Sequence, residues 1–242
     1  MRFITLHRMI ESRILILIVL ICAIMGLKDP DFFSRNNVTG ALLKISIEGI
    51  IVIGMAYLII LREIDLSVGE AMGLGSFFAI TFQQYGVAAG IVTGISAGVL
   101  VGAANGVLVL KGKLPSIAIT LGTMILVNGL IFVLTGSNSL AGSNENFTAL
   151  ALGRVWGIPV PIFLMLALTL IFNSILAKTT FGRNVYAVGG NETAARYAGI
   201  NVERVKFIAF VLTGALAGLA GVLLASRFSI ASGALGRQRR YS

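Results

Sequence analysis

The sequence is poor in charge, cysteine and histidine. Only 12% of its 242 residues are charged, whereas a typical soluble domain is about 25% charged, so a soluble globular fold is excluded. The one cysteine, Cys22, cannot form a disulfide within the chain. Together with the one histidine, His7, it cannot build a metal site of histidine and cysteine ligands. We therefore expect this chain to bind no metal.

Motifs for nucleotide binding and catalysis are also missing. Gly112 and Lys113 resemble the end of a phosphate-binding loop, but that motif needs glycine at position 107 and serine or threonine at 114. The chain has Val107 and Leu114 there. No nucleophile, base and orienting group cluster in the sequence, so we do not expect an enzyme. If ATP drives this protein, another chain binds it.

Long apolar runs dominate what is present. Hydrophobic residues make up 57% of the chain, and its mean hydropathy is +0.94. Runs long enough to cross a bilayer recur between short charged or glycine- and proline-containing breaks. We predict an all-α, polytopic integral membrane protein with about seven transmembrane helices. The predicted spans are Ile14–Leu27, Ile45–Leu61, Leu66–Gln83, Gly86–Leu110, Leu114–Thr135, Pro159–Ala177 and Phe207–Ser226.

Lysine and arginine lie mainly in the breaks between these runs. The formal net charge of +9 would suggest a nucleic-acid partner in a soluble protein, but basic residues beside membrane spans set topology instead, so we expect no nucleic-acid partner. With a cytoplasmic N-terminus, more of the lysine and arginine lies inside than outside, as the positive-inside rule requires. Residues 1–13 are then a cytoplasmic arm, and residues 178–206 form a cytoplasmic segment between the last two spans.

Glycines recur at four-residue spacing in the span Gly86–Leu110. At about 100° per residue, this spacing forms a slowly winding groove along one helix. Neighbouring helices can approach such a groove closely, so packing is favoured over direct ligand contact. The glycines predicted to serve helix packing are Gly90, Gly94, Gly98, Gly102 and Gly106, and, in the last span, Gly214 and Gly218.

Polar side chains within or beside the spans are candidates for a translocation path. Each could instead be a hydrogen-bond partner between helices, worth about 0.6 kcal/mol, but together they suggest an uncharged, hydroxyl-rich cargo. Ser67, with Glu70 three positions later, also has the capping-box pattern that begins a helix. The candidate path residues are Asp65, Ser67, Asn105, Thr120, Thr123 and Asn128.

A short polar segment near residue 190 has the pattern of a capped helix of about two turns. Gly189 and Gly190 end the preceding structure, and Asn191 is a good N-cap. Glu192 and Arg196 form a supportive i,i+4 pair, and Gly199 supplies a left-handed C-cap. A helix this short is marginal alone in water. It is suited to being pushed by a soluble partner, or it merely packs on its own protein or on lipid headgroups.

Several motifs occur in order along the chain: EIDLSVG at 63–69, NGV at 105–107, ITLGT at 119–123, KTTFGRN at 178–184, GGNETAAR at 189–196 and GINV at 199–202. In this order and spacing the chain resembles the permeases of bacterial sugar ABC importers, in the ribose, xylose and arabinose branch of the binding-protein-dependent permeases. The resemblance implies one permease domain over residues 1–242, in the lipid of the bacterial cytoplasmic membrane, carrying a pentose such as ribose.

The resemblance also implies partners: a second permease subunit, two cytoplasmic ATPase subunits that bind ATP and magnesium, and a periplasmic sugar-binding protein. The segment near residue 190 is similar to the family's coupling helix, which fits a cleft of the ATPase. Carried onto this chain, the coupling residues are Gly190, Asn191, Glu192, Ala194, Ala195, Arg196 and Gly199.

Two features depart from the family. Glu70 stands where members have a small residue, and residues 235–242 form an atypical tail that matches nothing in them, which favours a C-terminally truncated permease. Two alternatives stay open: a secondary transporter or channel for a small uncharged solute, and a truncated permease without function.

Overall fold

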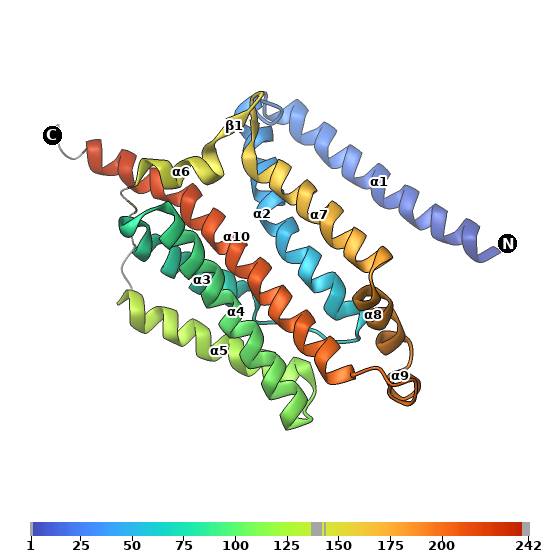
Figure 1. The fold of residues 1–242 in the computed structure, drawn as a ribbon. Coiled ribbons are helices and arrows are strands. Elements are labelled where there is room, and N and C mark those ends of the chain that lie inside the picture. The colour runs from blue at the N-terminus through green and yellow to red at the C-terminus, as the bar shows by residue number, and fades with distance from the viewer. Residues whose placement is uncertain (1, 137–141, 143, 239–242) are drawn as a thin grey trace. The chain divides into compact units, whose positions relative to one another are not determined.

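The computed structural model describes residues 2–136, 142 and 144–238, with side chains described at positions 15–136, 142 and 144–228. Almost all of these residues are helical, which confirms the predicted all-α class (Figure 1). Two short strands, β1 and β2, pair antiparallel, with Arg154 opposite Pro159. The elements are α1 (Arg2–Lys28), α2 (Arg35–Ile60), α3 (Val68–Phe82), η1 (Gln83–Tyr85), α4 (Val87–Gly112), α5 (Ser116–Thr135), α6 (Glu145–Leu152), β1 (Arg154–Val155), β2 (Ile158–Pro159), α7 (Val160–Lys178), α8 (Thr180–Gly190), α9 (Glu192–Tyr197) and α10 (Val202–Gln238).

The chain forms two compact units, residues 1–44 and residues 45–242. In the first unit a tight turn joins α1 to α2, where the rings of Phe32 and Phe33 meet edge to face. The Asn37 side chain donates a hydrogen bond of 2.7 Å to the Phe32 carbonyl oxygen. All the site residues discussed below belong to the second unit.

Five helices among the described residues are long and apolar enough to cross a membrane: α2, α4, α5, α7 and the part of α10 from Val202 to Phe228. The predicted count of seven spans is therefore not confirmed. The predicted span Leu66–Gln83 corresponds to α3, which has 15 residues and is about 22 Å long, short of the roughly 30 Å hydrocarbon core. The predicted span Ile14–Leu27 lies in α1, a helix of 27 residues, of which the apolar part Leu15–Lys28 has described side chains.

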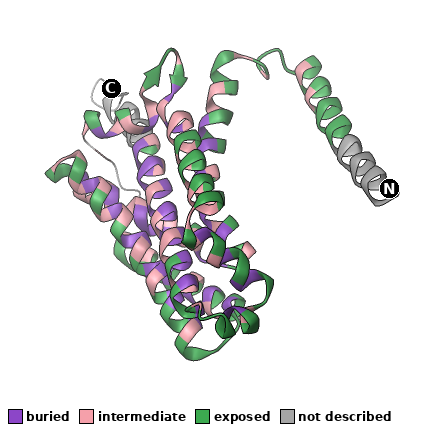
Figure 2. Ribbon diagram, turned by 45° about the vertical axis from the view of Figure 1, so that its right-hand side comes forward, coloured by how far each residue is buried: buried purple, intermediate pink, exposed green. Residues whose placement is uncertain are grey.

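The core of the second unit lies where α3, α4 and α10 pack together, and Figure 1 shows α10 running beside the other two. Along α10, 61% of the apolar stretch is buried, against 11% for α5 and 6% for α7. Figure 2 shows this contrast between the buried and exposed helices. The apolar surfaces of α5 and α7 are therefore left for lipid or another chain.

All the glycines predicted to serve packing lie at close helix contacts. A Cβ added at Gly98 would overlap the carbonyl oxygen of Gly214, and one at Gly102 would overlap that of Phe210. A Cβ at Gly218 would lie 2.6 Å from the carbonyl oxygen of Gly94. At the two ends of the groove, Gly90 faces α3 and Gly106 faces the Phe207 ring. Only glycine lets α4 and α10 approach this closely.

Candidate functional site

Two short helices, α8 and α9, connect α7 to α10. Thr179 caps α8: its side-chain oxygen accepts a hydrogen bond from the Gly182 backbone N–H at 3.2 Å, and its hydroxyl donates to the Ile175 carbonyl at 2.6 Å. At the other end of α8, a Cβ on Gly189 would overlap the carbonyl oxygen of Ile60. The end of α8 therefore lies directly on the end of α2.

The caps expected around Glu192–Tyr197 are present. The Asn191 side chain accepts a hydrogen bond of 3.0 Å from the Ala194 backbone N–H. Gly199 has φ +81, its N–H donates to the Arg196 carbonyl, and the Ile200 N–H donates to the Ala195 carbonyl, both at 3.0 Å. This is the Schellman arrangement, which needs the left-handed conformation that glycine adopts easily.

The predicted coupling residues divide between an inner and an outer face of α9. Ala195 is 4% exposed and packs in a core cluster with Val188 of α8 and Val202 of α10. Ala194, Arg196 and the adjacent Tyr197 are exposed, and Tyr197 is 90% exposed. Gly190, Asn191 and Gly199 are exposed as well. The outer face is free to contact another chain, whereas Ala195 contacts its own chain.

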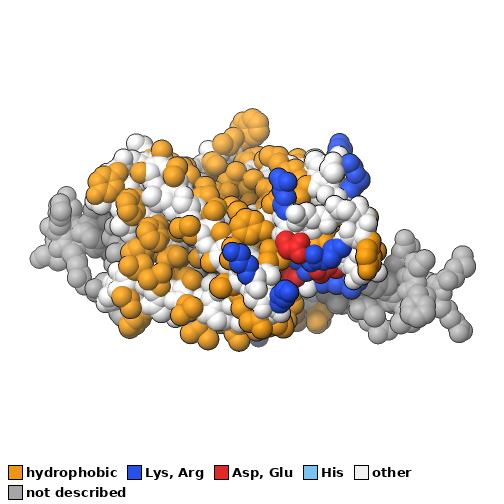
Figure 3. All heavy atoms as spheres, turned by 60° about the horizontal axis from the view of Figure 1, so that its bottom comes forward, with side chains coloured by type: hydrophobic (Ala, Val, Ile, Leu, Met, Phe, Trp, Pro, Cys, Tyr) orange, Lys and Arg blue, Asp and Glu red, His pale blue; other side chains and the backbone are white. Residues whose placement is uncertain are grey.

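Five charged side chains of alternating sign form a continuous network at this end of the second unit (Figure 3). The Lys206 Nζ lies 2.8 Å from a carboxylate oxygen of Glu63 and 2.8 Å from one of Glu192. The other Glu192 oxygen lies 3.0 Å from Arg196, which also pairs with Glu203. The Glu63 and Lys206 side chains are only 11% and 12% exposed, whereas Arg196 is 48% exposed.

This network sets the ionisation of Glu192. The hydrogen bond from Lys206 lowers the pKa of its carboxyl group below the ordinary value of 4.5, burial opposes this, and the hydrogen bond from Arg196 adds to the lowering. Sequence reasoning found the pair of Glu192 and Arg196 but missed Glu63, Lys206 and Tyr197. The ion pair of Glu63 and Lys206 joins residues far apart in the chain, so no local pattern could reveal it.

The structure brings three of the candidate path residues together. Asp65, Ser67 and Asn105 are each no more than 3% exposed. One Asp65 oxygen accepts hydrogen bonds from the Ser67 N–H at 2.8 Å and the Ser67 hydroxyl at 2.7 Å. The Asn105 amide donates to the other Asp65 oxygen at 3.2 Å and to the Ser67 hydroxyl oxygen at 2.7 Å.

The expected capping box is wrong, because the Ser67 side chain makes no capping bond to α3.

The other three candidate path residues lie on α5. Thr120 is fully buried, and its hydroxyl accepts a hydrogen bond of 3.1 Å from the Leu66 N–H while donating to the Ser116 carbonyl at 2.8 Å. Thr123 is 9% exposed. Asn128 is exposed on the apolar surface of the helix and is apart from the buried cluster.

The family described as "Branched-chain amino acid transport system / permease component" matches residues 37–236 of this chain. The chain belongs to this permease family. The matched range contains α9, the ionic network and the buried polar cluster.

Curated relatives of this permease agree with the resemblance found in the sequence. It is 36% identical over 229 residues to the ribose import permease protein of Haemophilus influenzae, covering 92% of this chain and 71% of that relative. It is 38% identical to the L-arabinose ABC transporter permease protein of Azospirillum brasilense, covering 91% and 66%. It is 41% identical to the ribose import permease protein of Bacillus subtilis, covering 84% and 65%. None of the solved structures matches the chain.

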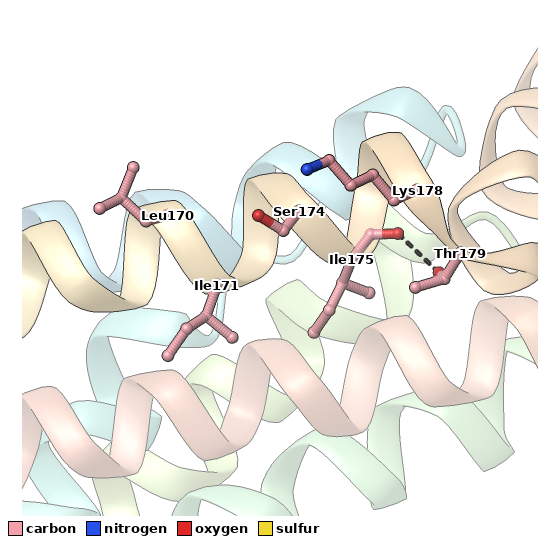
Figure 4. Close-up of a pocket in the computed structure, with 6 residues that line it drawn as sticks. All are labelled: Leu170, Ile171, Ser174, Ile175, Lys178 and Thr179. Carbon is pink, nitrogen blue, oxygen red and sulfur yellow. Dashed lines mark hydrogen bonds between the residues drawn. The ribbon is translucent and has the colours of Figure 1, made fainter.

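One open groove of about 520 Å³ lies along the C-terminal half of α7 in this permease (Figure 4). Its walls are Leu170, Ile171, Ser174, Ile175, Lys178 and Thr179. The lining is mostly apolar and comes from one helix and its C-cap, so it has the character of a lipid-facing surface and not of a sugar site.

In the part of the chain that the structure describes, no three histidine, cysteine or acidic side chains are grouped so as to hold a metal ion.

Proposed function

We propose that this chain is the membrane-spanning permease subunit of an ATP-binding cassette importer that carries a pentose, ribose or arabinose, into the cell. The named relatives include ribose import permeases and L-arabinose permeases. These names support a pentose as the cargo, and they do not distinguish ribose from arabinose.

The observation that carries the proposal is the arrangement of α9. This six-residue helix is capped at both ends, fixed by Ala195 and Glu192 on its inner side, and presents Ala194, Arg196 and Tyr197 outward. A helix this short is not stable alone, so its fixed position serves to present a rigid surface. A rigid surface between two spans suits contact with a soluble subunit that must move the membrane helices.

The proposed complex contains a second permease subunit, two cytoplasmic ATPase subunits and a periplasmic sugar-binding protein. The ATPase subunits bind ATP and Mg²⁺, and this chain binds neither. The protein lies in the bacterial cytoplasmic membrane with its N-terminus and α9 in the cytoplasm. Arg62 lies beside α9, where it donates a hydrogen bond to the Gly190 carbonyl, and Figure 3 shows further lysine and arginine side chains on this face, which agrees with the positive-inside rule.

Uptake measurements test this function. Deleting the gene should lower the uptake of radiolabelled D-ribose or L-arabinose, and restoring it should recover uptake. Uptake should stop when ATP is depleted and persist when the ion gradient is collapsed. Uptake that depends on the ion gradient and does not depend on ATP would contradict an ATP-driven importer and favour a secondary transporter.

A further inference from the structure

The loop of residues 62–67, which joins α2 to α3, contacts two different parts of the second unit. Its first two residues reach the segment that carries α9. Arg62 donates a hydrogen bond of 3.2 Å to the Gly190 carbonyl at the junction of α8 and α9, where a cation is favoured by the exposed carbonyls of a helix end. Glu63 pairs with Lys206, which in turn pairs with Glu192 of α9.

The remaining residues of the loop reach α4 and α5. The Ile64 N–H donates to the Ser116 hydroxyl at 3.2 Å and the Leu66 N–H donates to the Thr120 hydroxyl at 3.1 Å, so two successive turns of α5 hold the loop. Asp65 accepts from the Asn105 amide of α4.

The hydrogen bond from Arg62 to Gly190 is exposed, whereas most of the other contacts of the loop are shielded from water. Asp65, Ser67, Asn105 and Thr120 are all nearly or fully buried, and the Glu63 and Lys206 side chains are only 11% and 12% exposed. Buried hydrogen bonds and ion pairs are costly to break singly, because the partner left behind stays unpaired in a medium of low dielectric. The loop therefore moves together with the groups that it binds.

We propose that the loop of residues 62–67 is the link through which a displacement of α9 reaches α4 and α5, with Glu63 and Lys206 as its positioning residues. The inference rests on the proposed function, because it assigns a route to the movement that the ATPase imposes on α9. Lys206 is the junction: one ammonium group holds the carboxylate of the moving helix and the carboxylate of the loop.

The peptide chain from α9 to α10 offers a second route, which loss of Lys206 leaves intact. Without Lys206, α9 can still be pushed, but only the exposed hydrogen bond from Arg62 to Gly190 then ties the loop to the segment that carries α9. The consequence is a complex that assembles and hydrolyses ATP while moving less sugar for each ATP.

The experiment measures the ATP hydrolysed per D-ribose or L-arabinose transported, using the complex purified through a tag on this chain and reconstituted in liposomes with its binding protein. The variants are Lys206→Met, which keeps the aliphatic stem and removes the charge, Glu63→Gln, which changes only the loop side, and Lys206→Arg, which keeps the charge. Arg204→Met is the matched control, because Arg204 is exposed on the same turn of α10.

We expect Lys206→Met and Glu63→Gln to raise the ATP consumed per sugar several-fold with normal subunit association, and Lys206→Arg and Arg204→Met to keep the wild-type ratio. A wild-type ratio in both charge-removing variants would overturn the inference and leave the proposed function standing. Failure of both to assemble, with Lys206→Arg assembling, would also overturn it, because the lysine would then be purely structural. A wild-type complex with no ATP-driven uptake would contradict the proposed function itself.

Discussion

Gly98 of α4 and Gly214 of α10 contact each other through their backbones, and a Cβ added to either would overlap the carbonyl oxygen of the other. The relationship is reciprocal, so neither position can accept a side chain unless the two helices separate. This contact lies in the middle of the packed group of α3, α4 and α10, to which the loop of residues 62–67 is attached.

Replacing Gly98 with alanine should therefore destabilise the protein by about 1–3 kcal/mol, because the added methyl group forces the helices apart. Gly122→Ala is the matched control, since a Cβ at Gly122 meets nothing within 4 Å and alanine is the better helix former by about 1 kcal/mol. The measurement is the temperature at which half of the detergent-solubilised protein is lost from its size-exclusion peak. Equal melting temperatures for the two variants would contradict the packing described.

The buried cluster around Asp65 predicts an asymmetry between two substitutions. Asn105→Leu removes the amide that donates hydrogen bonds to Asp65 and Ser67. Because the buried Asp65 side chain then lacks one of its donors, we expect the free energy of unfolding to fall by about 1–3 kcal/mol. Asp65→Asn removes the charge and still offers an oxygen to Ser67, so it should cost less. The same melting assay compares them. An Asn105→Leu variant that is more stable than Asp65→Asn would contradict the role of Asn105 as the donor of this cluster.

Glu192 predicts a pH dependence in the docking of α9. Its pKa is lowered in the folded protein below the ordinary value of 4.5, chiefly by Lys206. The ionised Glu192 therefore stabilises the folded protein fully at pH values above about 4.5. This stabilisation is lost as the pH falls through the lower pKa that Glu192 has in the folded protein. The effect is small, because Glu192 is 43% exposed and solvent screens its ion pairs.

A nitroxide at Tyr197→Cys, in a Cys22→Ser background, would report this loss as increased mobility below pH 4.5. Adding Glu192→Gln should weaken this pH response, and the response that remains belongs to Glu203, whose pKa is also lowered by its hydrogen bond from Arg196 of α9. An identical pH response with and without Glu192 would assign the change to another group.

Local sequence patterns predicted α9 well and the network around it poorly. Asn191, Gly199 and the pair of Glu192 and Arg196 act within one or two turns, so their residue types and spacing carry the information. The ion pair of Glu63 with Lys206 depends on how α2 and α10 pack.

Helix α8 was not predicted as a helix, because its sequence is rich in glycine and poor in strong helix formers. It forms because Val185 and Val188 pack into the core beside α10, where tertiary contacts outweigh weak propensity. The capping box at Ser67 failed for a related reason: its hydroxyl donates to Asp65, and its oxygen accepts from the Asn105 amide of α4 instead of from the N–H groups of α3.

In the proposed complex α9 contacts a partner ATPase, and cysteine cross-linking can detect this contact. Cys22 is the only cysteine in the sequence, so Cys22→Ser gives a clean background for single cysteines at Ala194, Tyr197, Ala195 and Tyr85. Ala194 and Tyr197 lie on the outer face of α9, Ala195 lies on its inner face, and Tyr85 is 74% exposed just beyond the far end of α3. With a short thiol-to-amine cross-linker in native membranes, we expect products joined to an ATPase subunit from positions 194 and 197 and none from 195 or 85. Absence of such products from 194 and 197, or equal products from all four positions, would contradict it.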